Sequence, residues 1–150
     1  MSPKTHIPQT EPFRWENVPV LSYKEEGGTH FKSITRQVLF DDGDGTGAQL
    51  RYFEIAPAGH STLERHDHVH SVMVVRGRGR ALVGREIHDL GVNDLVRVPP
   101  QTWHQFRATT DEPLGFLCLV RSERDKPQRP AESDLAALRA DGDVASFLRV

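Results

Sequence analysis

The sequence predicts an all-β fold, a small barrel or sandwich flanked by an extended N-terminal segment and a short helical tail. Short apolar segments recur at close spacing from residue 49 to residue 121, and glycine or proline punctuates the gaps between them. No run between residues 31 and 122 has a convincing helical period. Because the two ends differ from this region in composition, we divide the chain into an arm, a barrel and a linker with helical tail, at residues 1–30, 31–122 and 123–150.

Each strand of the barrel has its own signal. Residues 49–55 alternate apolar and polar side chains, as a half-buried strand does. Most of the later segments are separated by turn-forming residues, namely glycine, proline, asparagine or aspartate. The aspartate- and glycine-rich run at 41–47 lacks the glutamate of a calcium loop and is expected to form a hairpin tip. The remaining strands are expected at residues 62–66, 70–76, 80–83, 85–89, 95–98, 103–108 and 114–121.

The ends follow different patterns. Four prolines within the first 19 residues indicate an extended arm, whose apolar residues from Trp15 to Tyr23 could anchor it on the barrel or on a second subunit. The tail carries apolar residues at helical spacing, and Gly142 is placed to split it into two short helices. The apolar positions of the tail are Leu135, Leu138, Val144 and Leu148.

Composition restricts the class of protein. A chain of 150 residues with 37% hydrophobic and 27% charged residues suits one domain with a core. A net charge of −2 gives no reason to expect a nucleic acid or an anionic membrane as partner. The longest apolar run, residues 114–120, is too short to span a bilayer, and the N-terminus does not resemble a signal peptide. The single cysteine, Cys118, is expected to be a buried core thiol in a cytoplasmic protein.

Residues 64–70 place a glutamate and three histidines at every second position. On one straight strand the ends of this stretch would lie roughly 20 Å apart, whereas a metal reaches a histidine nitrogen at about 2.1 Å. The chain must therefore reverse if these side chains share an ion. A reversal at residues 67–69 sets His66 across from His70 and leaves His68 at the turn, in solvent. In the rival register, His66 and His68 end the first strand and Glu64 is displaced outward.

Two segments resemble the paired motifs of the cupin superfamily. In the first, six residues separate His70 from Gly77, which puts His70 at the family's glutamate position, and His66 stands at its second histidine and Glu64 at its first. Glutamate and histidine have traded places, so three histidines and one carboxylate remain. In the second motif, residues 94–104, His104 keeps the place of the last ligand, whereas Asn93 and Gln101 replace two family glycines. The resemblance covers about a third of the chain.

The resemblance implies a jelly-roll barrel (a double-stranded β-helix) with ligands pointing inward from facing strands. It implies one divalent transition metal per chain, bound by Glu64, His66, His70 and His104 or by a three-histidine face with Glu64 outside the ligand set. Iron, manganese, nickel, cobalt, copper and zinc all suit such ligands. The expected pocket wall is apolar, as in most small-molecule sites, and consists of Val72, Val74, Phe106, Phe116 and either Tyr52 or Phe53.

Open coordination positions in a dry pocket suit substrate chelation and dioxygen activation. We therefore expect a dioxygenase-like enzyme acting on an enolisable or phenolic small molecule that chelates the metal. The alternatives are a non-catalytic metal- or ligand-binding cupin, such as a sensor or storage protein, and a metal-dependent isomerase or lyase. A homodimer is expected, because the barrel leaves sheet edges that need cover.

Other polar residues carry weaker signals. His60 is expected at the pocket rim or in solvent, and His88 at the surface. Arg51, Arg97 and Arg107 lie on expected strands and could each meet an anionic substrate, although strand arginines are usually solvated or paired. No nucleophile elbow is present, so a serine hydrolase is not supported.

Overall fold

The computed structural model describes residues 4–24 and 27–150. The predicted arm therefore includes two stretches, 1–3 and 25–26, that lie outside the described residues. A 3₁₀ turn, Asp42–Asp44, joins the fourth and fifth strands, and the helices α1 (Glu132–Arg139) and α2 (Gly142–Phe147) follow the last strand. The strands are β1 (Gln9–Glu11), β2 (Arg14–Trp15), β3 (Leu21–Ser22), β4 (Lys32–Phe40), β5 (Ala48–His60), β6 (His70–Arg76), β7 (Gly79–Val83), β8 (Glu86–Leu90), β9 (Leu95–Val98), β10 (His104–Ala108) and β11 (Leu114–Arg121).

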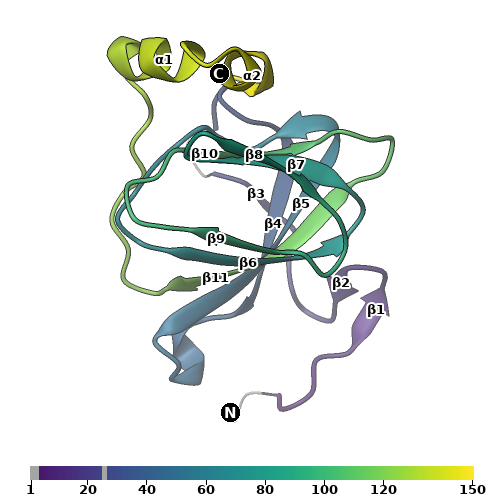
Figure 1. The fold of residues 1–150 in the computed structure, drawn as a ribbon. Coiled ribbons are helices and arrows are strands. Elements are labelled where there is room, and N and C mark those ends of the chain that lie inside the picture. The colour runs from purple at the N-terminus through teal and green to yellow at the C-terminus, as the bar shows by residue number, and fades with distance from the viewer. Residues whose placement is uncertain (1–3, 25–26) are drawn as a thin grey trace.

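Strands β3 to β11 form one antiparallel sheet that curls into a jelly-roll barrel. Figure 1 shows β7, β8 and β10 in one layer and β6, β9 and β11 in the other. The long strand β5 joins the layers, since it pairs with β11 as far as Ile55 and with β10 at His60. Between these positions its register with β4 shifts, and Ala58 adopts a positive φ of 67°. Apolar side chains from both layers fill the space between them, among them Phe53, Phe106, Phe116, Val72 and Val74.

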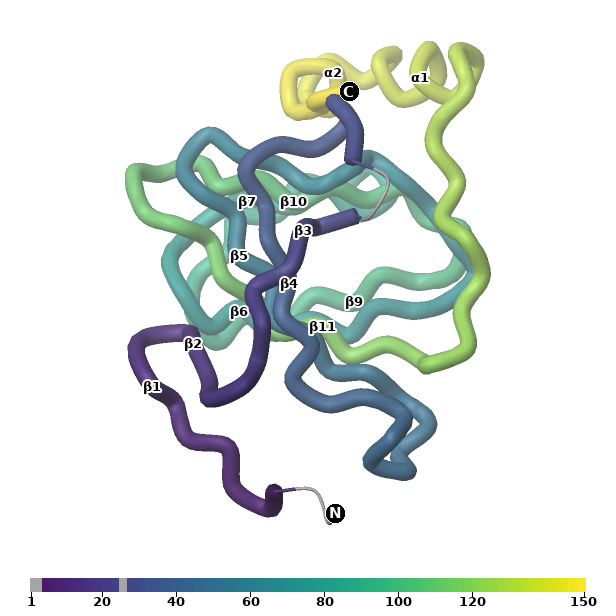
Figure 2. Tube along the Cα trace, turned by 180° about the vertical axis from the view of Figure 1, so that it is seen from behind, coloured from purple at the N-terminus to yellow at the C-terminus, as the bar shows by residue number. Residues whose placement is uncertain are grey.

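The N-terminal arm packs on the outside of the barrel. Phe13 stacks on Tyr52 with ring centroids 5.3 Å apart, and Trp15 meets the same ring edge-on at 5.6 Å. β3 then pairs with β4, so the arm adds a strand to the sheet, as Figure 2 shows from behind. Tyr52 was expected to be a candidate for the pocket wall, but that expectation is wrong. Successive residues of a strand face opposite sides, and on β5 it is Phe53 that points inward.

The C-terminal helices cover one end of the barrel (Figure 1). Their buried residues form a second apolar cluster with two side chains of the barrel, Leu63 and Leu82. Burial of such side chains contributes about 25 cal/mol per Å² of apolar area, which docks the tail firmly. Among the described residues, neither helix has the length that a bilayer-spanning segment needs. The tail contributes Leu138, Val144, Phe147 and Leu148 to this cluster.

Two expectations about strands are corrected. Residues 62–66 do not form a strand; only isolated bridges occur there, from Glu64 to His104 and from Arg65 to Gln128. Conversely, β4 was not expected. Its inward positions alternate Ile34 and Arg36, and its outward-facing Gln37 is fully buried beneath the arm. Because Arg36 faces the barrel interior and the outward-facing Gln37 is also buried, β4 lacks the alternation of apolar and polar residues by which a strand is recognised in a sequence.

Gly77 provides a test of the packing between neighbouring loops. Its φ is 68°, and an added β-carbon would collide with the carbonyl oxygen of Pro113. Gly84 has the same φ, but its β-carbon would meet only a methyl group of Thr102 at 3.7 Å. We expect Gly77→Ala to lower the free energy of unfolding by about 2–4 kcal/mol, from backbone strain plus overpacking. Gly84→Ala should lower the free energy of unfolding only by the backbone strain, about 1–2 kcal/mol. Urea denaturation measures both, and equal losses would contradict this account.

Candidate metal centre and substrate pocket

The structure brings three histidines from separate segments together inside the barrel. His66 lies in the loop after β5, His70 opens β6, and His104 opens β10. The Nε2 atoms of His66 and His70 are 2.9 Å apart, and one ligand nitrogen of each histidine lies within 4.8 Å of the other two. His66 and His104 are almost fully buried. This arrangement is the one that a single metal ion with three imidazole ligands requires.

The outer nitrogens of the three rings are held by the surrounding chain. His66 Nδ1 lies 2.7 Å from the carbonyl oxygen of His68, and His104 Nδ1 lies 2.9 Å from that of Thr102. A carbonyl only accepts, so each of these Nδ1 atoms donates its proton and each Nε2 keeps a lone pair. His70 Nδ1 contacts Cys118 Sγ at 2.8 Å instead. Metal-binding histidines are usually oriented by such outer hydrogen bonds, so the donor set fits a metal.

The protonation state of the cluster also suits a metal. Burial lowers the pKa of His66 to about 4, and it lowers the pKa values of His70 and His104 as well. Neighbouring histidines lower the pKa values of all three rings further, because charging one ring disfavours charging the next. The three imidazoles are therefore neutral near pH 7, the form that binds metal ions.

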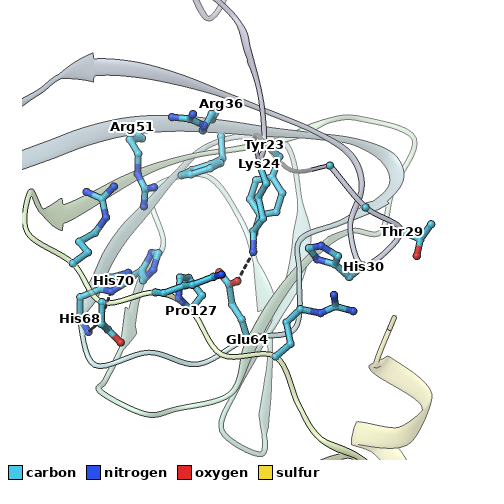
Figure 3. Close-up of a pocket in the computed structure, with 17 residues that line it drawn as sticks. Tyr23, Lys24, Thr29, His30, Arg36, Arg51, Glu64, His68, His70 and Pro127 are labelled. Atoms are coloured by element: carbon cyan, nitrogen blue, oxygen red, sulfur yellow. Dashed lines mark hydrogen bonds and ion pairs between the residues drawn. The ribbon is translucent and has the colours of Figure 1, made fainter.

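Glu64 is held beside the cluster by its backbone and by a lysine of the arm. Its N–H donates to the carbonyl oxygen of His104 at 3.3 Å, and the reciprocal bond measures 3.0 Å. Its carboxylate pairs with Lys24 Nζ at 2.6 Å (Figure 3). The Glu64 side chain is 8% exposed, so this ion pair is shielded from water. Glu64 thus lies beside the three histidines, and its carboxylate already has a cationic partner. Metal ligation by Glu64 stays a prediction.

The side chain of His68 does not project into solvent, which corrects the expectation for the turn. The chain does bend at residues 67–68, but the imidazole of His68 is 7% exposed. It stacks on His66 with centroids 3.6 Å apart, and its Nδ1 lies 2.8 Å from an Asp125 carboxylate oxygen. Asp125 also accepts the backbone N–H groups of Asp67 and His68. The linker before α1 therefore folds back and covers the turn.

Two spaces that share lining residues adjoin the histidines. A small inner cavity of about 30 Å³ is apolar on one side and meets Glu64, His70 and His104 on the other. An outer pocket of about 860 Å³ shares Tyr23, Phe53, Glu64 and His70 with it (Figure 3). Of the side chains expected in the wall, Phe106 and Phe116 line the inner cavity, whereas Val72 and Val74 are buried in the surrounding core.

Much of the outer pocket comes from residues that the sequence analysis did not assign to it. Tyr23 and Lys24 enter from the arm, and Arg36 from the unexpected strand β4. Arg51 is the only one of the three weighed strand arginines to line this pocket: Arg97 is exposed, and Arg107 donates to the carbonyl oxygen of Phe147. The linker adds Arg124, Asp125, Lys126, Pro127 and Arg129. Local periodicity carried no signal for these contacts.

Cys118 lies directly behind the cluster. It is fully buried, as expected, but it contacts His70 at 2.8 Å, and Arg51 Nη2 lies 3.6 Å from its sulfur. Burial raises the pKa of the thiol, and the positive charge of Arg51 opposes that rise. The cysteine is therefore part of the surroundings of the metal centre rather than an ordinary core residue.

Residues 51–120 match the Cupin domain family. A relative from Rhodospirillum rubrum, named 1-methylthio-D-xylulose 5-phosphate methylsulfurylase, is 60% identical over 136 residues, which cover 91% of this chain and 86% of the relative. The chain belongs to the cupin superfamily. Within this fold, His66, His70 and His104 are placed so that they could hold one metal ion.

Solved structures resemble this cupin along nearly its whole length. A cupin 2 conserved barrel domain protein from Rhodopseudomonas palustris superposes with a TM-score of 0.92 at 49% identity, covering 97% of this chain and 100% of that one. A cupin-2 domain protein from Rhodospirillum rubrum gives a TM-score of 0.85 at 56% identity, with 96% of each chain covered. The arm and the helical tail are therefore shared features and not additions peculiar to this chain.

Proposed function

We propose that this cupin is a metal-dependent methylsulfurylase that removes the methylthio group from a 1-methylthio ketose 5-phosphate. The observation that carries the proposal is a thiol in contact with one histidine of the triad, in a chain 60% identical to a relative with that name. Such a ketose is enolisable, and its carbonyl and neighbouring hydroxyl can chelate a metal. It therefore falls within the substrate class expected from the sequence.

His66, His70 and His104 would hold one divalent transition metal, with Glu64 beside them. When bound, the metal supplies a Lewis acid that polarises the ketone oxygen. The residues of the chain position the substrate and exclude water: Phe106 and Phe116 form the apolar wall of the inner cavity. Such a dry wall strengthens the electrostatic interactions inside it.

Cys118 is proposed as the acceptor of the methylsulfanyl group. Its sulfur attacks the sulfur of the methylthio group, the C1–S bond breaks, and the bonding electron pair passes to C1 and the ketone oxygen as an enolate. The thiol is oxidised to a methyl disulfide and C1 is reduced. The thiol reacts as its thiolate, its proton passing to solvent, and the Nδ1–H of His70 and the guanidinium of Arg51 stabilise the charge on the sulfur. An external thiol must then reduce the disulfide and release methanethiol.

The enolate needs one proton at C1 to become a methyl ketone. Glu64 and Lys24 form an ion pair that borders the outer pocket, and Glu64 also borders the inner cavity. We assign to this pair the delivery of that proton, because a proton donor must lie within hydrogen-bond reach of the reacting atom. The product is a 1-deoxy ketose 5-phosphate.

The direct test is turnover. Metal-supplied protein is incubated with 1-methylthio-D-xylulose 5-phosphate and a dithiol reductant under nitrogen, and methanethiol and the 1-deoxy product are measured by mass spectrometry. Equal amounts of both products support the proposal. In a parallel incubation in air, dioxygen uptake without methanethiol would favour the dioxygenase expected from the sequence. Tight binding without turnover would favour a binding protein.

A homodimer is also proposed. Met73 and Leu95 are paired on the outer face of β6 and β9, Leu119 lies on the same face of β11, and all three are exposed. Such a patch on a sheet is typical of an association surface. Light scattering should give about twice the chain mass of 16.9 kDa. Leu95→Glu should yield monomers, whereas Val92→Glu, at an exposed position outside the patch, should not; a monomeric wild type would contradict the proposal.

We propose a cytoplasmic location as well. The reaction depends on a reduced cysteine and on an external thiol, and both persist in a reducing compartment. Fractionation of cells that express the full chain checks this, and recovery from an oxidising compartment would contradict it.

A further inference from the structure

The described residues that line the outer pocket carry an excess of positive charge over negative charge. Among the described residues that line it, the two carboxylates, Glu64 and Asp125, are already engaged by Lys24 and by His68 with the turn backbone. The whole chain has a net charge of −2, so this concentration is local. Within the described part of the chain, the cationic side chains of the lining are Lys24, Arg36, Arg51, Arg124, Lys126 and Arg129.

Two of the arginines lie on the inner face of the barrel wall. Arg36 on β4 pairs with Phe53, and Arg51 lies two residues before Phe53 on β5, so both point to the side that Phe53 faces (Figure 3). The guanidinium of Arg51 lies over the Phe53 ring at 4.8 Å from its centroid. Its Nε is buried and has no hydrogen-bond partner among the described residues. A buried donor without a partner is costly, and an acceptor atom of a ligand placed there would remove that cost.

Arg124 completes the group from the linker. Its pKa is lowered, by burial first and then by the positive charges of Arg51 and Arg36, so the three guanidinium groups lie close enough to repel one another. Arg36 donates to the carbonyl oxygen of Ser22 at 3.2 Å, and Arg124 donates to that of Arg121 at 2.9 Å. Within residues 4–24 and 27–150, none of the three forms an ion pair with a carboxylate.

We propose that Arg36, Arg51 and Arg124 form the subsite for the phosphate group of a small phosphomonoester whose other end reaches the histidine cluster. This inference rests on the proposed function, because that function supplies a phosphorylated substrate. Guanidinium groups present planar pairs of donors that match phosphate oxygens. A dianionic phosphate relieves the repulsion among the three arginines and offers an acceptor for the Nε of Arg51.

The three arginines come from both the barrel and its flanking segments. Residues 51–120 match the Cupin domain family, and of the three arginines only Arg51 falls within them. Arg36 belongs to β4, and Arg124 to the linker, which is fastened by reciprocal backbone hydrogen bonds of 3.0 and 2.8 Å between Arg65 and Gln128. The metal ligands therefore come from the common barrel, and the selection of phosphorylated molecules comes from what surrounds it.

Calorimetric titration of the metal-loaded protein tests the subsite. Inorganic phosphate and D-xylulose 5-phosphate are expected to bind, and Arg36→Gln and Arg124→Gln should each weaken both by about tenfold or more, as loss of a charged hydrogen bond does. Arg97→Gln, which removes an exposed arginine from the opposite face of the sheet, should leave both affinities within about twofold. Thermal melts and metal content verify that each variant is folded and loaded.

Other results would overturn the subsite. If phosphate bound directly to the metal, its affinity would be unchanged in Arg36→Gln and Arg124→Gln. D-xylulose should bind with equal affinity to wild type and variants, and a parallel loss for this unphosphorylated sugar would mean that the arginines serve the fold or the sugar rather than the phosphate.

The two proposals can fail separately. If methanethiol is never released but phosphate binding depends on Arg36 and Arg124, the subsite holds and the methylsulfurylase proposal falls. If 1-methylthio-D-xylulose without its phosphate is turned over with the same kcat/KM as the phosphorylated form, the reaction holds and the subsite falls.

Discussion

Alanine at His66, His70 or His104 is expected to empty the metal site, whereas His68→Ala is expected to keep its metal. Removal of an outer hydrogen-bond partner of a metal ligand already costs about 10–100-fold in affinity, and removal of a ligand itself costs more. His66 is oriented by the backbone carbonyl of His68, which alanine retains. Loss of the stacked ring and its contact with Asp125 should instead lower the free energy of unfolding by about 1–2 kcal/mol.

Elemental analysis of tag-free protein from metal-supplemented medium measures these outcomes, with close to one ion per chain expected for the wild type. Glu64→Gln removes a negative charge whose field reaches His66 and His104, so it should weaken metal binding or shift metal preference. If His68→Ala emptied the site while Glu64→Gln left it untouched, the assignment of ligands would be wrong. A wild type that binds none of the six candidate metals would remove the site altogether.

Cys118→Ser is expected to abolish release of methanethiol while leaving the metal in place. A hydroxyl keeps the size of the side chain and can still bond to His70 Nδ1, but it is a far weaker nucleophile toward sulfur than a thiol. We expect kcat to fall by about 10³-fold or more, as when a nucleophile is removed from other enzymes. Turnover with the external thiol, followed by methanethiol detection, measures the loss.

The serine variant also separates two roles for the thiol. If Cys118 only orients His70, serine should restore near-normal kcat and Cys118→Ala should lose both metal and activity. If Cys118 accepts the methylsulfanyl group, both variants should be inactive, and wild-type protein treated with substrate without reductant should gain the mass of one methylsulfanyl group. Absence of that mass increase, together with an active serine variant, would contradict the proposed acceptor.

The sequence by itself determined the barrel and the identity of the three histidines that come together. Strand β5 carries an alternation of apolar and polar residues, and β6 and β11 carry short apolar runs between turn-forming residues, so both patterns predict strands from local sequence. The spacing of His66 and His70 about a turn, with His104 after a second proline-marked turn, predicts that these side chains lie within reach of one another, and the structure brings them together. Patterns over a few residues are sufficient for such features.

Only the tertiary structure decided how the site is completed. The ion pair of Lys24 with Glu64, the contact of Asp125 with His68 and the grouping of Arg36, Arg51 and Arg124 each join segments that lie far apart in the chain. In sequence, an isolated arginine or lysine on a strand or linker is indistinguishable from a solvated one. Its partner is set by the path of the arm and the linker around the barrel, and that path is determined by packing at Tyr52 and at the helical tail rather than by local periodicity.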